Sequence, residues 1–386
     1  MSVPRVLFYV QHLLGIGHLR RAALLAQALA DHGLETTLLT GGFPVPGLDV
    51  GRARLIQLAP VKSADSSFKT LIDERGEPID DRWRDARRRR VLEIFDSVRP
   101  EVVMLEMYPF GRRQMRFELD ALIAAVDAAG PRPLLLSSVR DVLVAKSNPA
   151  RADEAVRLVE RHFDAVLVHG DPAFIPFEAS FPAALRIAAK LLYTGYVARP
   201  QPAQGASSDG EVIVSAGGGA VGARLIEAAL ASRALTPLAE RTWRIIAGEN
   251  LDDAAYARFR AVAPSGVVVE RWRDDLPDRI ARAALTISQA GYNTVMEIVS
   301  AGVPAVVVPF ADAGETEQGF RARHFAERNL LTVVPDAELD GATLARGIAE
   351  ALGQRRAATT PDMTGAATTA RLVGELLARR QTRGAA

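Results

Sequence analysis

The sequence predicts an α/β protein with two successive doubly wound parallel sheets. Short continuous apolar runs alternate with amphipathic stretches, and this pattern stops at a polar segment and then restarts. A continuous apolar run indicates a strand that is covered on both faces, as in a parallel sheet between helices. Repeated strand–helix–strand units predict a doubly wound, Rossmann-like fold. At roughly 100–200 residues per domain, the 386 residues accommodate two such domains.

The first half contains five runs that have the character of buried strands, separated by helical patterns that begin with Leu19–His32. The five runs are Val6–Val10, Thr36–Thr40, Val102–Glu106, Leu134–Ser138 and Ala165–His169. We therefore expect residues 1–198 to form the N-terminal domain.

The segment Tyr196–Gly210 is rich in Pro, Gly, Ser and Ala and lacks periodicity, which favours a linker. Strand-like runs resume after it at Glu211–Ser215, Trp243–Ala247, Gly266–Glu270, Leu285–Ser288 and Ala305–Pro309. We expect a second domain over 211–362. Residues 363–386, with a helical pattern at Ala370–Arg380, should form a helix and tail that pack back on the N-terminal domain.

The composition excludes several classes of function. A formal net charge of +1 implies no general attraction to nucleic acid, and the absence of cysteine excludes disulfides, zinc–thiolate sites and thiol nucleophiles. Neither a metal site nor a cofactor is expected, since no His cluster has metal-ligand spacing. No apolar run reaches the ~18 residues of a membrane span, and the N-terminus lacks a signal-peptide pattern. We expect a cytoplasmic protein.

A glycine-containing turn follows the first strand, with Gly15, Gly17 and His18 at the start of a helix. Glycines let the backbone approach a ligand, and the helix N-terminus offers unpaired N–H groups to an anion. A dinucleotide-binding turn would need glycine where Arg20 stands, so that class is disfavoured. His18 is a candidate general base, because imidazole titrates near neutral pH. The alternative is that the glycines only shape a turn and His18 caps the helix.

A second glycine-rich turn follows the first strand of the second half and contains Ser215, Gly217, Gly218 and Gly219. It is a candidate phosphate cradle, although a plain tight turn is an alternative. No Lys-Ser/Thr pair follows it, which excludes a nucleotide-hydrolysing P-loop.

Three further segments in this half carry candidate ligand groups. Trp272 and Arg273 follow a strand. The indole of Trp272 could lie beside a nucleobase and the backbone of Arg273 could hydrogen-bond it, with a core aromatic as the alternative for Trp272. The segment Ser288–Glu297 places Gly291, Asn293, Thr294 and Glu297 at a helix start, where a pyrophosphate and ribose hydroxyls would fit. Glu317 and Gln318 begin another helix and together offer acceptors and donors to sugar hydroxyls. The alternatives are a helix-start charge for Glu297 and a solvated face for Glu317 and Gln318.

In their order and spacing, these segments resemble glycosyltransferase family 28, most strongly over Val212–Val334. This family includes a peptidoglycan enzyme that acts on a lipid-linked acceptor. The resemblance implies the GT-B fold, in which two Rossmann-like domains face each other across a cleft. Residues 1–198 would then be the acceptor-side domain, and residues 211–362 would be the nucleotide-sugar-binding domain. It also implies that the Trp272–Arg273 segment holds uracil, that Gly291 and Thr294 meet the diphosphate and that Glu297 meets the ribose. Glu317 and Gln318 would then contact the donor sugar, and Ser215–Gly219 would line the diphosphate.

The resemblance further implies transfer from a UDP-sugar to a hydroxyl acceptor, without a metal and with inversion. His18 or Glu106 would be the base. Ile16 and the Ala-Gly-Gly-Gly-Ala turn depart from the family pattern, so the donor sugar and the acceptor stay open. A nucleotide-sugar hydrolase or 2-epimerase is the alternative enzyme, and a non-catalytic nucleotide-sugar-binding subunit is the alternative of another class.

We expect the acceptor to be a small molecule or a lipid-linked compound, and arginines are its candidate ligands. Arg112 and Arg113 follow a strand end, and a basic run extends over residues 82–90. Such groups suit a phosphorylated acceptor or peripheral contact with the inner membrane face. The alternative for Arg87–Arg90 is a solvated helix face, since Asp81 and Asp85 are interleaved with the run.

Overall fold

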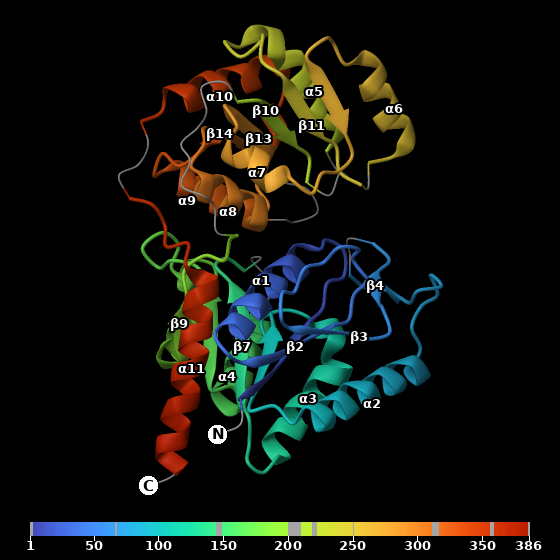
Figure 1. The fold of residues 1–386 in the computed structure, drawn as a ribbon, viewed down its shortest axis with the longest axis vertical. Coiled ribbons are helices and arrows are strands. Elements are labelled where there is room, and N and C mark those ends of the chain that lie inside the picture. The colour runs from blue at the N-terminus through green and yellow to red at the C-terminus, as the bar shows by residue number, and fades with distance from the viewer. Residues whose placement is uncertain are drawn as a thin grey trace. The chain divides into compact units, whose positions relative to one another are not determined.

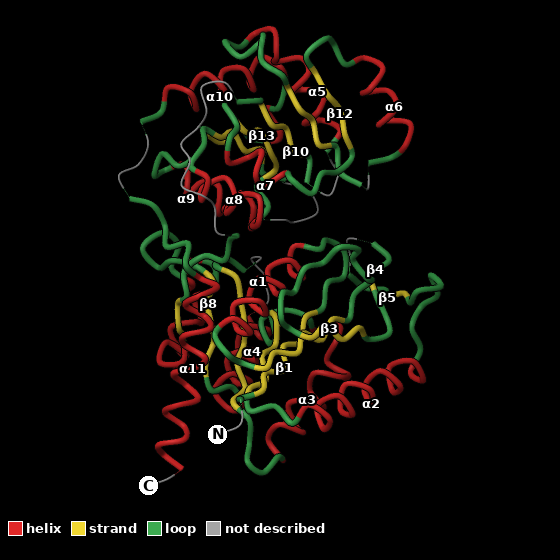
Figure 2. The backbone as a smooth tube through the Cα atoms, viewed as in Figure 1, coloured by secondary structure: helices red, strands yellow, loops and turns green. Residues whose placement is uncertain are grey.

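The computed structural model describes residues 3–65, 68–143, 149–199, 210–217, 222–249, 251–310, 316–355 and 359–384. The chain divides into two compact units. Unit 1 comprises Met1–Val197 and Pro361–Ala386, and unit 2 comprises Ala198–Thr360. Each unit contains one parallel sheet, drawn as arrows in Figure 1 and in yellow in Figure 2. These two sheets confirm the predicted fold class. Most of the expected linker lies outside the described residues.

Unit 1 is built on a seven-stranded parallel sheet with the order β3-β2-β1-β6-β7-β8-β9. Its strands are β1 (Arg5–Val10), β2 (Glu35–Thr40), β3 (Arg54–Gln57), β6 (Val102–Glu106), β7 (Leu134–Arg140), β8 (Ala165–His169) and β9 (Leu191–Tyr193). A small antiparallel pair, β4 (Lys62–Ser63) and β5 (Leu71–Ile72), lies outside this sheet. The two edge strands β3 and β9 were not predicted, because neither is a fully buried apolar run.

Both faces of this sheet are buried, which explains the continuous apolar runs. In β1, Leu7 and Tyr9 belong to one core cluster, whereas Val6, Phe8 and Val10 belong to another. The first cluster includes side chains of α2 (Asp81–Val98), α3 (Arg116–Ala128) and α4 (Pro149–His162), and the second includes side chains of α1 (Gly17–Asp31) and α11 (Gly365–Gly384). Successive residues of a strand point to opposite faces, so every position is needed for one core or the other.

Helix α11 joins unit 1 from the far end of the sequence. It packs against α1, as Figure 1 shows, and Ala370, Val373 and Leu377 enter the same core cluster as Val6 and Phe8. Two backbone hydrogen bonds connect the start of α11 and the segment before it to Tyr196. Tyr196 N–H donates to Asp362 O at 2.7 Å, and Gly365 N–H donates to Tyr196 O at 3.0 Å. The chain therefore leaves and re-enters unit 1 at adjacent points.

Unit 2 is built on a six-stranded parallel sheet with the order β12-β11-β10-β13-β14-β15. Its strands are β10 (Val212–Ser215), β11 (Trp243–Ile246), β12 (Val267–Glu270), β13 (Leu285–Gln289), β14 (Ala305–Val308) and β15 (Thr332–Val333). Its helices are α5 (Ala223–Ser232), α6 (Asp253–Val262), α7 (Leu276–Ala281), α8 (Tyr292–Ala301), α9 (Glu317–Ala326) and α10 (Gly341–Gly353). Its main core cluster joins the sheet to α5, α6 and α10.

Short 3₁₀ turns complete the secondary structure at Arg113–Met115, Phe177–Ala179, Pro182–Lys190, Arg233–Leu235 and Asp336–Glu338. Helix α2 has clear boundary signals: the Asp80 side chain accepts a hydrogen bond from Trp83 N–H, and Arg99 adopts the left-handed conformation with φ of 48°. These are common N-cap and C-terminal features of helices. Within the described part of the chain, every helix is too short or too polar to cross a membrane.

Candidate functional site

Each sheet has one point at which the chain changes its direction of winding. In unit 1 this point lies between β1 and β6, because the chain runs from β1 outward to β2 and β3 and then returns to β6. In unit 2 it lies between β10 and β13. The loops that leave the two strands at such a point diverge, and ligands of open α/β sheets bind there. The residues at the ends of β1, β6, β10 and β13, and those that follow these strands, are therefore the candidates for a ligand site.

A histidine–carboxylate pair lies at the switch point of unit 1. His18 is in the first turn of α1, and Glu106 is the last residue of β6. Nδ1 of His18 lies 2.6 Å from Oε1 of Glu106. The side chain of Glu106 is 1% exposed and that of His18 is 17% exposed. The helix cap at Ile16 has no side-chain hydrogen bond, so the expectation that His18 caps α1 is wrong.

Two arginines neutralise the same carboxylate. Nη2 of Arg21 lies 2.6 Å from Oε1 of Glu106, and its side chain is only 2% exposed. Nη2 of Arg112 lies 3.5 Å from Oε2 of Glu106. Arg21 was not among the predicted site residues, although it is three residues after His18 and so lies on the same face of α1. The three-residue spacing from His18 is the sequence feature from which Arg21 could have been predicted as part of the site.

The charge states of the pair follow from these neighbours. Burial lowers the pKa of His18 to about 3, with Arg112 and Arg140 acting in the same direction and Glu106 opposing them. Burial alone would raise the pKa of Glu106, but His18, Arg112 and Arg21 hold it well below its usual range. At neutral pH the imidazole is therefore neutral and Glu106 is a carboxylate. Nδ1–H then donates to Glu106, and Nε2 carries a lone pair. Among the described residues, Nε2 has no hydrogen-bond partner.

Arg112 and Arg113 diverge although they are adjacent in sequence. Arg112 adopts a left-handed conformation with φ of 58°, which turns its guanidinium toward Glu106. Arg113 instead pairs with Glu154 on α4, a carboxylate that it shares with Arg116. Of the two expected acceptor ligands, Arg112 is therefore the one that lies beside the histidine–carboxylate pair.

The basic run of α2 also splits into different environments. Arg84, Arg88 and Arg90 pair along the exposed helix surface with acidic residues three positions away. Arg87 is fully buried, and its Nε lies 2.9 Å from Oε2 of Glu118. The predictions that Arg87 lies on a solvated helix face, binds the acceptor or contacts a membrane are therefore wrong. Its guanidinium also donates to carbonyl or amide oxygens of three loops, namely those of Gly41, Ala59 and Gln11.

A second buried histidine lies on the neighbouring strands. His169 at the end of β8 contacts Ser138 Oγ through Nε2 at 2.7 Å and Thr194 Oγ1 through Nδ1 at 2.9 Å. Burial lowers its pKa to about 3. Both ring nitrogens are satisfied within the core, which favours a structural role.

The switch point of unit 2 brings two predicted loops together. Ser215 of β10 pairs in register with Ser288 of β13, so the turn after β10 and the turn after β13 start side by side. Gly217 has φ of 62°, and a Cβ there would lie 3.1 Å from Oε1 of Gln289. This position requires glycine for conformational and steric reasons. Gly218 and Gly219 lie outside the described residues.

Helix α8 begins directly at this point. Gly291 is its N-cap, and Asn293 and Thr294 lie in its first turn, half-buried. Glu297 follows one turn later and is also half-buried. A Cβ added at Gly291 would meet nothing within 4 Å, and the same holds for Gly15 in unit 1. The chain's own packing therefore does not explain the glycine at either position, whereas close approach of a ligand would.

Trp272 lies just after β12 and is 54% exposed. The alternative of a core aromatic is therefore wrong. The side chain of Arg273 pairs with two carboxylates: its Nε lies 2.5 Å from Asp275 Oδ1, and its Nη1 lies 3.2 Å from Glu270 Oε1.

Glu317 and Gln318 start α9, and both are tied to the protein. Glu317 is buried and pairs with the buried Arg321 one turn later at 2.5 Å, so the solvated face expected as its alternative is wrong. Oε1 of Gln318 accepts a hydrogen bond from Phe310 N–H at 3.1 Å. The Gln318–Phe310 bond therefore connects the start of α9 to the segment that follows β14, whereas the Glu317–Arg321 pair lies within the first turns of α9. In the described part of the chain, no group of three His, Cys, Asp or Glu residues is placed to hold a metal ion.

Two parallel-sheet α/β units, each with candidate ligand groups at its switch point, define the architecture of the GT-B glycosyltransferases. Solved structures of this class match almost the whole chain. The calicheamicin glycosyltransferase CalG4 matches with a TM-score of 0.62 at 17% identity, covering 98% of each chain. MurG of Acinetobacter baumannii matches with a TM-score of 0.58 at 16% identity, covering 97% of this chain and 99% of that one.

The sequence comparisons specify the type within that class. Residues 213–375 match the glycosyltransferase family 28 C-terminal domain, so this part of the chain is similar to family 28. A relative in Herminiimonas arsenicoxydans is the UDP-N-acetylglucosamine--N-acetylmuramyl-(pentapeptide) pyrophosphoryl-undecaprenol N-acetylglucosamine transferase. It is 34% identical over 212 residues, which are 51% of this chain. The match spans 58% of the length of that relative. The resemblance inferred from the sequence is confirmed.

Proposed function

We propose that the protein is a metal-independent, inverting glycosyltransferase that transfers a sugar from a UDP-sugar to an acceptor hydroxyl. The observation that carries this proposal is the 2.6 Å contact between His18 and Glu106, which leaves Nε2 of a neutral imidazole able to take a proton. The family 28 match of residues 213–375 supports the donor class, as does the named donor of the Herminiimonas relative.

In the proposed reaction His18 is the general base. Nε2 accepts the proton of the acceptor hydroxyl while its oxygen forms a bond to the anomeric carbon. The bond between that carbon and the diphosphate oxygen breaks, and its electron pair leaves with UDP. Attack opposite the leaving group inverts the anomeric configuration. Glu106 stabilises the imidazolium that forms, because Nδ1–H donates to its carboxylate.

Unit 2 supplies the donor site in this proposal. The backbone N–H groups at the start of α8 and the turn at Ser215–Gly217 would bind the diphosphate, and the positive end of the helix dipole would stabilise its developing charge. Glu297 would accept hydrogen bonds from ribose hydroxyls. Trp272 and the backbone of Arg273 would contact uracil, and Glu317 and Gln318 would contact the sugar.

The acceptor site belongs to unit 1. Arg112 has a cationic side chain beside His18 and is 13% exposed, which suits an acceptor with an anionic group next to its hydroxyl. We place the reaction in the cytoplasm. A lipid-linked acceptor would require peripheral contact with the inner membrane face, and a small-molecule acceptor would not.

Calorimetry with UDP tests the donor site. Glu297→Ala should weaken UDP binding by roughly 1.5–3 kcal/mol, the usual worth of a hydrogen bond to a charged group. The matched control is Glu350→Ala, an exposed carboxylate on α10, which should leave the affinity unchanged. Unchanged affinity in Glu297→Ala would contradict the ribose assignment.

Turnover assays test the reaction. Wild-type protein should release UDP from a UDP-sugar, with UDP-N-acetylglucosamine as the first candidate, only when an acceptor is present. UDP release or sugar epimerisation with donor alone would show a hydrolase or an epimerase instead. Nucleotide-sugar binding with no turnover across acceptor panels, phosphorylated and lipid-linked compounds included, would favour a binding subunit.

A further inference from the structure

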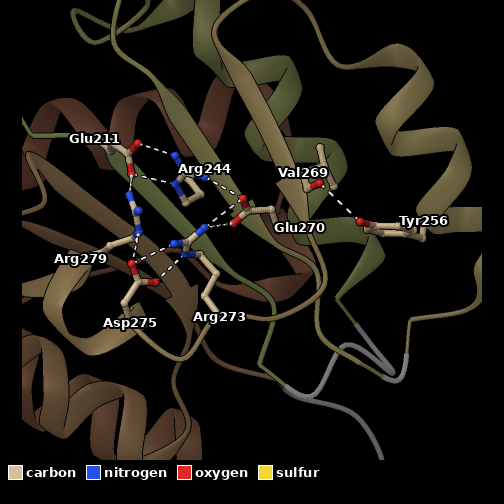
Figure 3. A network of polar contacts seen from close by, with 8 residues as sticks. All are labelled: Glu211, Arg244, Tyr256, Val269, Glu270, Arg273, Asp275 and Arg279. Atoms are coloured by element: carbon tan, nitrogen blue, oxygen red, sulfur yellow. Dashed lines mark hydrogen bonds and ion pairs between the residues drawn. The ribbon is translucent and has the colours of Figure 1, made fainter.

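A closed ring of alternating charges lies in unit 2, beside the segment that carries Trp272. Figure 3 shows each arginine bridging two carboxylates and each carboxylate bridging two arginines. The ring consists of Glu211, Arg244, Glu270, Arg273, Asp275 and Arg279. The closest contacts of its six sides measure 2.7, 2.9, 3.2, 2.5, 3.0 and 3.0 Å in that order, the last returning from Arg279 to Glu211.

The ring connects elements that are far apart in sequence. Glu211 immediately precedes β10, Arg244 lies on β11 and Glu270 ends β12. Asp275 is the N-cap of α7, and Arg279 lies within that helix. The loop between β12 and α7 is therefore held on one side by the sheet and on the other by α7. Arg273, in the middle of that loop, is bound by both.

The residue before Trp272 is anchored independently. Nη1 of Arg271 donates to Leu251 O at 2.7 Å, and its guanidinium lies 4.3 Å from the ring centre of Tyr256. Both neighbours of Trp272 are thus fixed through their side chains, while the indole between them is 54% exposed. A large aromatic side chain that is exposed on an anchored backbone is a rigid flat surface available for stacking.

We propose that this ring is a positioning device for nucleotide recognition: it fixes the Trp272–Arg273 segment before the ligand arrives, so that the uracil base binds without ordering the loop. This inference rests on the proposed function, since it assumes that a UDP-sugar is the ligand. The residues of the ring act through Trp272 and the backbone of Arg273 rather than by touching the base. Preorganisation of this kind raises affinity by removing the entropy cost of ordering a loop on binding.

The geometry favours a ring over six independent pairs. An isolated exposed pair contributes little, because two long side chains must be ordered for one screened interaction. In the ring, every side chain is already held by one partner when it meets the second. The ring is neutral as a whole, with three charges of each sign. Within the ring, hydrogen bonding to Arg273 lowers the pKa of Asp275 to about 2.

Two variants open the ring at different points without touching Trp272 or Arg273. Arg244→Gln removes a bridge on the sheet, and Arg279→Gln removes a bridge on α7. The matched control is Arg258→Gln, which breaks a single exposed pair with Glu227 elsewhere in the same unit. Arg244→Lys keeps the charge but loses the fork of donors, so it should rescue part of the effect.

The first measurement uses the nucleotide-free protein. Hydrogen exchange over residues 271–276 should accelerate in Arg244→Gln and Arg279→Gln and stay at the wild-type rate in Arg258→Gln. The second measurement is calorimetry with UDP and with ADP. Base–aromatic stacking is worth roughly five- to 150-fold in affinity, so we expect the two ring variants to bind UDP about five- to tenfold more weakly. ADP affinity should fall by less than UDP affinity, because any base can stack on Trp272 whereas the backbone of Arg273 is proposed to contact uracil, so selectivity for UDP should also fall.

The outcomes separate this inference from the proposed function. Faster exchange with unchanged UDP affinity would overturn the positioning role and leave the donor site standing. Unchanged exchange would overturn the claim that the ring fixes the segment. Equal losses for UDP and ADP would indicate general destabilisation and would also overturn it. If wild-type protein binds no uridine nucleotide, the proposed function fails and the inference fails with it, whatever the exchange rates show.

Discussion

The substitution Glu106→Gln separates the structural and the chemical role of one buried carboxylate. The amide has nearly the same shape and its oxygen can still accept the Nδ1–H of His18, so the histidine keeps a partner. The negative charge is lost, however. Arg21 then becomes a buried cation that has lost its 2.6 Å anionic contact, and an imidazolium at His18 is no longer stabilised.

Both effects have expected magnitudes. Removing one partner of a buried ion pair costs about 3–5 kcal/mol. At roughly 2–4 °C per kcal/mol for a unit of this size, the melting temperature should fall by about 6–20 °C. A positioned general base contributes about 10²–10⁴-fold to rate. The charge behind it matters to that contribution, so kcat should fall by at least about tenfold at a temperature where the variant is folded.

A second variant keeps the test sharp. Glu106→Gln combined with Arg21→Gln removes both charges, and the pair of amides can hydrogen-bond. Stability should recover, since a neutral replacement of a buried pair is often tolerated, but turnover should not. The measurements are thermal unfolding and UDP release with donor and acceptor. Wild-type turnover in Glu106→Gln would refute the stated role of the carboxylate, and stability that does not recover in the double variant would refute the argument about Arg21.

Of four further predictions, two concern pH, one a buried arginine and one a glycine. Because the pKa of His18 is lowered to about 3 from 6.5, the acid limb of kcat/KM should lie well below pH 6.5 and should disappear in His18→Ala along with about 10²–10⁴-fold of rate; a limb at pH 6.5 would contradict the neutral imidazole. As the pH falls, His18 and His169 bind protons in the unfolded chain before they do so in the folded protein. The free energy of unfolding should therefore fall between pH 6.5 and pH 3, by about 1 kcal/mol per pH unit for each histidine. Urea unfolding at pH 7 and pH 5 measures this slope, and His169→Gln should reduce it. Arg87→Leu should destabilise by about 3–5 kcal/mol because it strands buried Glu118, whereas Arg88→Leu should cost under about 1 kcal/mol; equal costs in urea unfolding would place Arg87 on the surface. Gly217→Ala should cost about 1–2 kcal/mol through its positive φ, with Gly15→Ala, which has open space, as the near-neutral control; a neutral Gly217→Ala would show that the turn can relax.

The central strands could be predicted from sequence because each residue of such a strand faces one core or the other. Val6–Val10 is continuous for this reason, and its predicted bounds match β1 apart from Arg5. Edge strands such as β3 carry no such signal, since three of its four residues are exposed. Predicted ends also shifted by one or two residues, as in β7, which continues to Arg140.

Single candidates at strand ends were predictable, but their partners were not. The position of His18 after the first strand and of Glu106 at the end of a later strand marks both as candidates. Their contact depends on β1 and β6 being neighbours, which only the sheet order reveals. The orientation of Trp272 away from the core is a similar tertiary fact, because a buried and an exposed aromatic look alike in an isolated segment.

Arg87 shows a signal that was present and was overlooked. Trp83, Arg87 and Val91 are spaced by four residues, so Arg87 lies on the apolar stripe of α2. The dense run of arginines hid this periodicity. The acidic partner, Glu118, lies 31 residues away on α3, which no local pattern could identify.

The return of the chain to unit 1 after Thr360 has a consequence for how the protein is made. During translation, every residue of unit 2 leaves the ribosome before α11 does, so the later unit can complete its core first. The apolar surface of α1 against which Ala370, Val373 and Leu377 pack remains exposed to solvent during that interval. The first-made unit is thus the last to finish folding, and its exposed apolar face is the part of the nascent chain that a chaperone would need to shield.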